Sequence, residues 1–80
     1  MQTTRAMQYV RAFAGRDAEI YNDKVKYGRS FKIWGWREQD YKECAAALWL
    51  AGFTVKVRTS KQWSARGGRH YKLTRLLVAD

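Results

Sequence analysis

The segment 61–72 combines cations, glycines and aromatic residues in one short stretch. Arginines flank Gly67 and Gly68, and glycine lets a backbone approach a phosphate group closely. The aromatic rings offer flat faces on which nucleic-acid bases can stack, while the cations attract phosphate oxygens. The alternative is a solvated loop whose Trp63 folds back on the sheet. The candidate contacts are Lys61, Trp63, Arg66, Arg69, His70, Tyr71 and Lys72.

The charge of the chain is concentrated around this segment. The 80 residues include 16 Lys and Arg against 7 Asp and Glu, which gives a net charge of +9. Residues 54–79 hold seven of the cations and no acid, whereas residues 1–53 hold nine cations and six acids. Such a field attracts nucleic acid, an acidic protein surface or an anionic membrane. We expect the seven cations, Lys56 and Arg58 included, to form one continuous positive ridge.

A second group of aromatic and basic residues lies in the segment 31–36. Apolar and polar residues alternate there, which predicts a strand with Phe31 and Ile33 on its inner face. Indoles interleaved with cations on the outer face could stack bases while holding a phosphate backbone. The alternative is that the indoles form a second small core or a dimer contact. The outer-face candidates are Lys32, Trp34 and Trp36, with Arg29 just before the strand.

No pattern in the sequence predicts catalysis or a bound metal. One Cys and one His cannot complete a disulfide or a structural zinc site, and Cys44 lies among alanines. The acids Asp17, Glu19 and Asp23 lie in or next to turns, where such residues often bond their own backbone. His70 has no evident partner for general-base work. We therefore expect a protein that is not an enzyme and that uses no cofactor.

One helix is predicted, with both of its ends specified. Apolar residues recur at helical spacing from Arg37 to Ala51. Acidic residues in the first turn suit the helix dipole, and Gly52 follows where a left-handed cap belongs. The second half of the helix, within the apolar run 44–53, is apolar all round, so an N-terminal hairpin or a second copy of the chain must cover it. The secondary expectation is a homodimer through residues 44–53.

The remaining predicted elements are strands separated by glycine-containing and polar turns. They give an α+β fold, with one small domain over residues 1–80 and one central helix packed on a mostly antiparallel sheet in the order βββαββ. The last two strands form a basic hairpin over 54–78, with a mobile loop over 59–70. The alternation breaks at 75–78, which suggests a bulge. The predicted strands are 8–14, 18–27, 31–36, 54–58 and 71–78.

Two functions compete for the basic surface. The first is a small nucleic-acid-binding protein, for DNA or RNA, whose hairpin grips the phosphate backbone. The alternative is a small inhibitor or adaptor, of the kind that a mobile element or phage could encode, which docks on an acidic surface of a larger nucleic-acid-processing protein. The lone cysteine, with neither a membrane span nor a signal peptide in the sequence, predicts a soluble cytoplasmic protein without a membrane partner.

Overall fold

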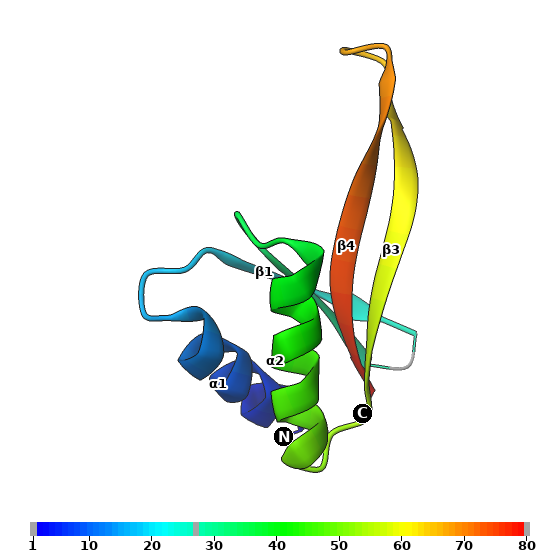
Figure 1. Ribbon diagram of the computed structural model, residues 1–80. Helices are drawn as coiled ribbons and strands as arrows, with labels where there is room; N and C mark the ends of the chain where they lie inside the picture. The colour runs from blue at the N-terminus through cyan, green and yellow to red at the C-terminus, as the bar shows by residue number, and fades with distance from the viewer. Residues whose placement is uncertain (1, 27, 80) are drawn as a thin grey trace.

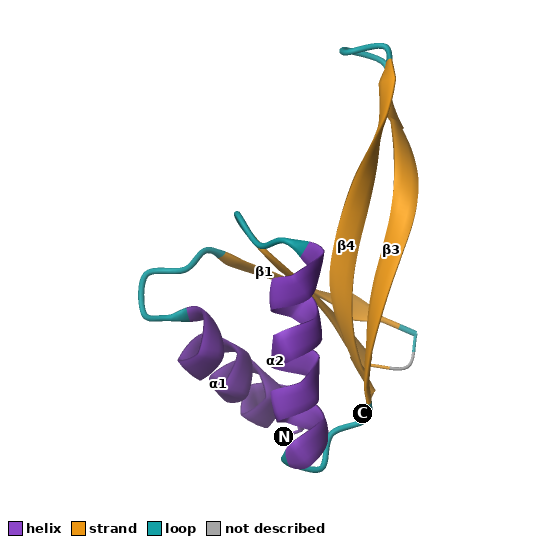
Figure 2. Ribbon diagram, viewed as in Figure 1, coloured by secondary structure: helices purple, strands orange, loops and turns teal. Residues whose placement is uncertain are grey.

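Two helices cover one face of a four-stranded antiparallel sheet and leave its other face open (Figure 1, Figure 2). The computed structural model describes residues 2–26 and 28–79. The elements are α1 (Gln2–Ala14), β1 (Ile20–Val25), β2 (Gly28–Ile33), α2 (Glu38–Leu50), β3 (Val55–Ser64) and β4 (Arg69–Ala79). Across the sheet the strands lie in the order β1, β2, β4, β3. This arrangement confirms the α+β class.

The first element is a helix, where the sequence predicted a strand over 8–14. Ala6 and Val10 are buried one helical turn apart, and Ala14 continues the same stripe against the core. The aromatic and β-branched residues of this stretch favour strands only weakly, and packing on the core overrides that preference. β1 therefore pairs with β2 rather than with residues 8–14, and the order of elements is αββαββ.

The second helix agrees with the prediction at both ends. The Asp40 carboxylate accepts a hydrogen bond from the Arg37 backbone N–H at 2.9 Å, which closes the first turn. At the other end Gly52 has a φ of +96°, and the Phe53 N–H donates to the Leu48 carbonyl at 3.0 Å. Neither helix of the described chain is long and apolar enough to cross a membrane.

The core lies between the two helices and the sheet. Its strand residues all point to the covered side, which we call the helix-side face of the sheet, as opposed to the open face. Val55 and Val57 extend this core along β3. The largest fully buried side chains are Val10, Phe31, Ile33, Cys44, Leu48 and Leu76.

The predicted dimer contact divides into a buried and an exposed part. Cys44, Leu48 and Phe53 belong to the core, and α1 packs beside α2 in place of the predicted N-terminal hairpin. Trp49 and Leu50, by contrast, are 63% and 87% exposed. A homodimer through residues 44–53 stays a prediction, and Trp49 and Leu50 are the large apolar side chains that this segment leaves exposed for it.

The hairpin of β3 and β4 is longer and more regular than expected. The two strands pair without a bulge from Val55 opposite Val78 to Ser64 opposite Arg69, so the predicted loop over 59–70 is mostly strand. β2 pairs with β4 only over residues 76–79 of β4, and the rest of the hairpin projects from the body (Figure 1). The radius of gyration is 13.0 Å, against about 11.6 Å for a compact chain of this length.

Candidate functional site

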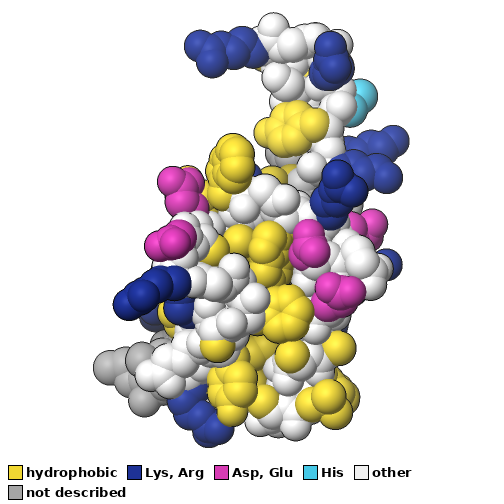
Figure 3. All heavy atoms as spheres, turned by 60° about the vertical axis from the view of Figure 1, so that its left-hand side comes forward, with side chains coloured by type: hydrophobic (Ala, Val, Ile, Leu, Met, Phe, Trp, Pro, Cys, Tyr) yellow, Lys and Arg dark blue, Asp and Glu magenta, His cyan; other side chains and the backbone are white. Residues whose placement is uncertain are grey.

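The projecting hairpin carries charge on both of its faces. Side chains alternate along a strand, so the parity of the residue number decides the face. Figure 3 shows Lys and Arg side chains along the hairpin, while acidic side chains lie on the body. On the helix-side face, beyond the last helical contact, the cross-strand pairs are Lys61 with Lys72 and Trp63 with His70. On the open face they are Lys56 with Leu77, Arg58 with Arg75, Ser60 with Leu73, Gln62 with Tyr71 and Ser64 with Arg69.

The expected single positive ridge is therefore wrong. The steps from Arg58 to Lys61 and from Lys72 to Arg75 are each three residues, and an odd step moves a side chain to the other face of a strand. Lys61 and Lys72 lie on the helix-side face, whereas four cations lie on the open face. Arg66 lies in the turn.

Two like-charged pairs stand directly opposite each other in the hairpin. Arg58 faces Arg75 on the open face, and Lys61 faces Lys72 on the helix-side face. Directly opposed side chains have their Cβ atoms about 4.5–5.5 Å apart, and like charges at that position destabilise the pairing. Among residues 2–26 and 28–79 no carboxylate forms an ion pair with these four side chains. The hairpin therefore holds repulsion that bound anions would relieve.

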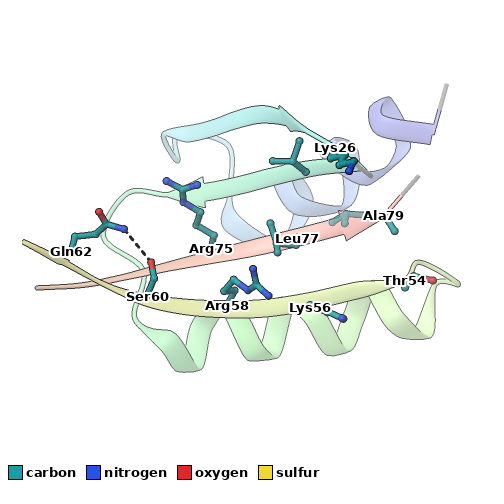
Figure 4. Close-up of a pocket in the computed structure, with 11 residues that line it drawn as sticks. Lys26, Thr54, Lys56, Arg58, Ser60, Gln62, Arg75, Leu77 and Ala79 are labelled. Atoms are coloured by element: carbon teal, nitrogen blue, oxygen red, sulfur yellow. Dashed lines mark hydrogen bonds between the residues drawn. The ribbon is translucent and has the colours of Figure 1, made fainter.

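The open face of the sheet is hollowed at the base of the hairpin (Figure 4). The hollow has a volume of about 580 Å³ and includes the apolar side chains of Val25 and Leu77. Leu77 points to this open face, which explains the break in alternation that had suggested a bulge. Four cations line the hollow and give it a positive rim: Lys26 from the turn after β1, Lys56 and Arg58 from β3, and Arg75 from β4.

The tip of the hairpin is organised by Ser64. Its carbonyl accepts from the Gly68 N–H at 2.8 Å, and its hydroxyl accepts from the Gly67 N–H at 3.3 Å. The glycine amides are thus engaged within the turn rather than directed at a ligand. Trp63 is 59% exposed and meets the His70 ring edge-on, with centroids 4.9 Å apart. Tyr71 is exposed on the open face, so the backbone of the hairpin separates it from Trp63 and His70.

The two indoles predicted to share a strand face differ in exposure. β2 ends before Trp34, and Gly35 turns the chain with a φ of +84°. Trp36 then packs back on the core, with ring centroids 5.9 Å from Phe13 and 5.1 Å from Tyr41. Trp34 remains 72% exposed. The expectation that both indoles are exposed on the open face is wrong for Trp36, whose half-buried ring packs on the core as in the alternative interpretation.

Arg29 and Lys32, the other two candidates of this region, point to opposite sides of β2. Arg29 lies opposite Val78 on the helix-side face and donates a hydrogen bond to the Asn22 side-chain oxygen at 3.2 Å. Lys32 is exposed on the open side. Of these two cations, only Lys32 therefore lies on the open face of the sheet, which the hairpin continues.

Tyr41 determines where β4 separates from β2. Its hydroxyl accepts a hydrogen bond from the Ile33 N–H at 3.0 Å and donates one to the Ile33 carbonyl at 3.2 Å. Burial raises the pKa of Tyr41, so the hydroxyl keeps the proton that it donates. Phe31 still pairs with β4 two residues earlier. The tyrosine therefore substitutes for a strand at Ile33, and no pattern in the sequence predicts this role.

A notch of about 290 Å³ lies between β4 and the loop that follows β2, just past the end of the β2–β4 pairing. The Ala79 N–H donates to the Thr54 carbonyl on the β3 side. Because amides along a strand alternate in direction, those of Lys72 and Thr74 point away from β3 and toward the notch. β4 thus has a free edge here. The notch is lined by Lys32, Trp34, Trp36, Tyr71, Lys72 and Thr74, among others.

Comparison with protein-family models, with curated proteins and with solved structures gives no significant match to this chain.

Proposed function

We propose that this chain is a small nucleic-acid-binding protein without catalytic activity, and that the β3–β4 hairpin is its binding element. The observation that carries the proposal is that two like-charged cross-strand pairs lie in the hairpin, Arg58 with Arg75 and Lys61 with Lys72. A polyanion supplies the counter-charges that the described part of the chain does not provide, and it does so at closely spaced positions.

Further support comes from the groups between and around these pairs. Tyr71 and Trp63 are exposed aromatic rings on the same hairpin, and Trp34 lies exposed beside it. Such rings stack on bases without regard to sequence. The expected phosphate contacts are Arg58, Lys61, Arg66, Arg69 and Lys72, to which the register adds Lys56 and Arg75.

The test is the salt dependence of binding to a labelled 20-base-pair duplex, followed by fluorescence anisotropy. With about five to seven phosphates neutralised, the logarithm of the association constant should fall against the logarithm of salt concentration with a slope of about −4.5 to −6. Arg16→Glu, in the loop after α1 and away from the hairpin, is the control and should change the slope little. A flat salt dependence contradicts the proposal.

A second candidate function is supported by the free edge of β4. An extended acidic peptide of a partner protein could add a strand to Lys72 and Thr74, with Lys32 at its side. Strand addition uses main-chain hydrogen bonds, which nucleic acid does not supply. This candidate keeps the inhibitor or adaptor function as the alternative.

A proline substitution at Thr74 tests strand addition at the free edge of β4. Thr74→Pro removes the outward N–H while leaving the hydrogen bonds to β3 intact, and Thr74→Ala controls for loss of the hydroxyl that bonds Thr59 at 3.0 Å. The probe is a labelled peptide of alternating Glu and Val. Strand addition predicts that only the proline variant loses the peptide, whereas unchanged binding in both variants contradicts it.

A further inference from the structure

We infer that the hairpin binds in the major groove of B-form DNA, standing edge-on so that each face meets one wall of phosphates. This inference rests on the proposed function and specifies its ligand. Its starting point is the placement of cations on both faces, with Arg58 and Arg75 on one and Lys61 and Lys72 on the other. A ribbon that lies flat on a nucleic acid would use one of these pairs and leave the other in solvent.

The dimensions of the ribbon suit that groove. The outermost hydrogen bond between the described residues of β3 and α2 joins the Thr59 hydroxyl to the Glu38 carboxylate at 3.4 Å. The strands continue for six residues from Thr59 to Ser64, which is about 20 Å of free ribbon. A sheet with its side chains is about 10 Å thick. The major groove of B-DNA is about 12 Å wide and the minor groove about 6 Å, so only the major groove admits the ribbon edge-on.

The order of the charges along the ribbon fits two phosphate walls. Starting from the body, Arg58 and Arg75 point to one side, Lys61 and Lys72 to the other, and Arg69 to the first side again. Arg66 lies at the turn between the strands. Each wall of the groove thus meets cations from both strands of the ribbon.

The same geometry predicts low sequence selectivity. Side chains on the two faces point at the walls of the groove, whereas base edges lie on its floor. What faces the floor is the backbone edge of one strand and the turn. The hairpin should therefore discriminate the shape of the duplex rather than its sequence, which separates B-form DNA from A-form RNA with its deep and narrow major groove.

The first experiment compares ligands for the intact chain at one salt concentration. The probes are a 20-base-pair DNA duplex, the RNA duplex of the same sequence, and the DNA duplex carrying glucosylated hydroxymethylcytosine, which fills the major groove. We expect at least tenfold weaker binding to the second and third, and no displacement from DNA by the minor-groove ligand netropsin. Equal binding to RNA, or displacement by netropsin, overturns groove insertion. If none of the nucleic acids binds, the proposed function fails as well.

The second experiment asks whether both faces are used. The variants are Arg58→Ala with Arg75→Ala, and Lys61→Ala with Lys72→Ala; each removes one like-charged pair and so should not impair folding. Each double variant should reduce the salt slope on duplex DNA by about 2. A reduction by one double variant only indicates a ribbon that lies flat and overturns the inference, while the proposed function remains. The single variant Arg16→Ala serves as the control.

Discussion

The hydroxyl of Tyr41 takes both backbone hydrogen bonds of Ile33, accepting from its N–H at 3.0 Å and donating to its carbonyl at 3.2 Å. A side chain from α2 thereby completes the edge of β2 at the residue where β4 turns away. The ladder between β2 and β4 stops at Phe31 opposite Leu76, and the hairpin is free to project. The hairpin thus begins to project at the residue whose backbone bonds Tyr41.

Removal of this hydroxyl should destabilise the fold. Tyr41→Phe leaves the Ile33 N–H and carbonyl without their partner in a buried place, which costs about 1–3 kcal/mol of unfolding free energy. Urea denaturation followed by circular dichroism measures the loss. The matched control is Tyr21→Phe, because Tyr21 is exposed and bonds only the Glu19 side chain; it should change stability by less than about 0.5 kcal/mol. Equal effects in both variants would show that the Ile33 contact is not stabilising.

Charge reversal at Arg58 should move stability and binding in opposite directions. Arg58→Glu replaces a repulsive pair with Arg75 by an attractive one, worth about 0.2–1 kcal/mol of added stability. The same change should weaken duplex binding and lower the salt slope by about 1 or more. Arg16→Glu alters the net charge equally and should leave both quantities nearly unchanged. A destabilised Arg58→Glu would contradict the repulsion argued for this pair.

Cys44 should react slowly with thiol reagents. It is buried in the core, and desolvation raises its pKa to about 11 from the ordinary 9.0. At pH 8 the folded chain then contains about one-hundredth of the thiolate of an exposed cysteine, before any steric protection is considered. Labelling with Ellman's reagent, with and without denaturant, measures the difference. Similar rates in both conditions would place the thiol at the surface.

The same thiol gives a pH dependence of stability. Its raised pKa means that the folded chain holds the proton more tightly than the unfolded chain does, so stability is fully present below pH 9 and declines as the pH rises toward 11. Tyr41, whose pKa is also raised by burial, adds to the decline in the same direction. Cys44→Ala should therefore show a shallower alkaline decline than the natural chain. An identical decline would assign the effect to Tyr41 alone.

Gly28 should tolerate substitution least among the glycines. It has a φ of +155°, and a Cβ there would overlap the backbone carbonyl of Val78, which belongs to the paired part of β4. Gly28→Ala should prevent that pairing and unfold the chain or lower its melting temperature severely. Gly35→Ala is the control, since its φ of +84° costs about 1–2 kcal/mol but its surroundings are empty. A mild Gly28 variant would contradict the close approach of β2 and β4.

The parts of the fold that could be predicted are those in which local pattern and burial agree. Residues 38–50 have helical spacing, an acidic first turn and a terminal glycine, and they form α2. Residues 2–14 have the same spacing at Ala6 and Val10, but the aromatic and β-branched residues of 8–14 suggested a strand. Residues 59–64 are strand without alternation, because both faces of the projecting ribbon meet water and neither requires apolar side chains.

The candidate site was predicted in composition but not in geometry. The acid-free segment after residue 53 identified the hairpin and its cations. Which face each cation occupies follows from the register of the strands. The step from Arg58 to Lys61 enters the expected loop, and the step from Lys72 to Arg75 reaches the expected bulge, so the alternation was not followed across either step. Trp36 was misplaced for a related reason, since the turn at Gly35 reverses the alternation assumed for it. Neither the register of the strands nor the turn at Gly35 could be predicted from a short stretch of sequence.

The outer half of the ribbon, residues 59–74, adds little to the buried core, which is formed on the body side of the fold. Segments with few buried apolar contacts open at a lower free energy than the rest of a domain. Amide hydrogens there should exchange with deuterium faster than those of α2 or of β4 beside β2. A ligand bound to the ribbon should slow the exchange of these amides. Hydrogen exchange at residues 59–74 would therefore measure how much of the protein has ligand bound.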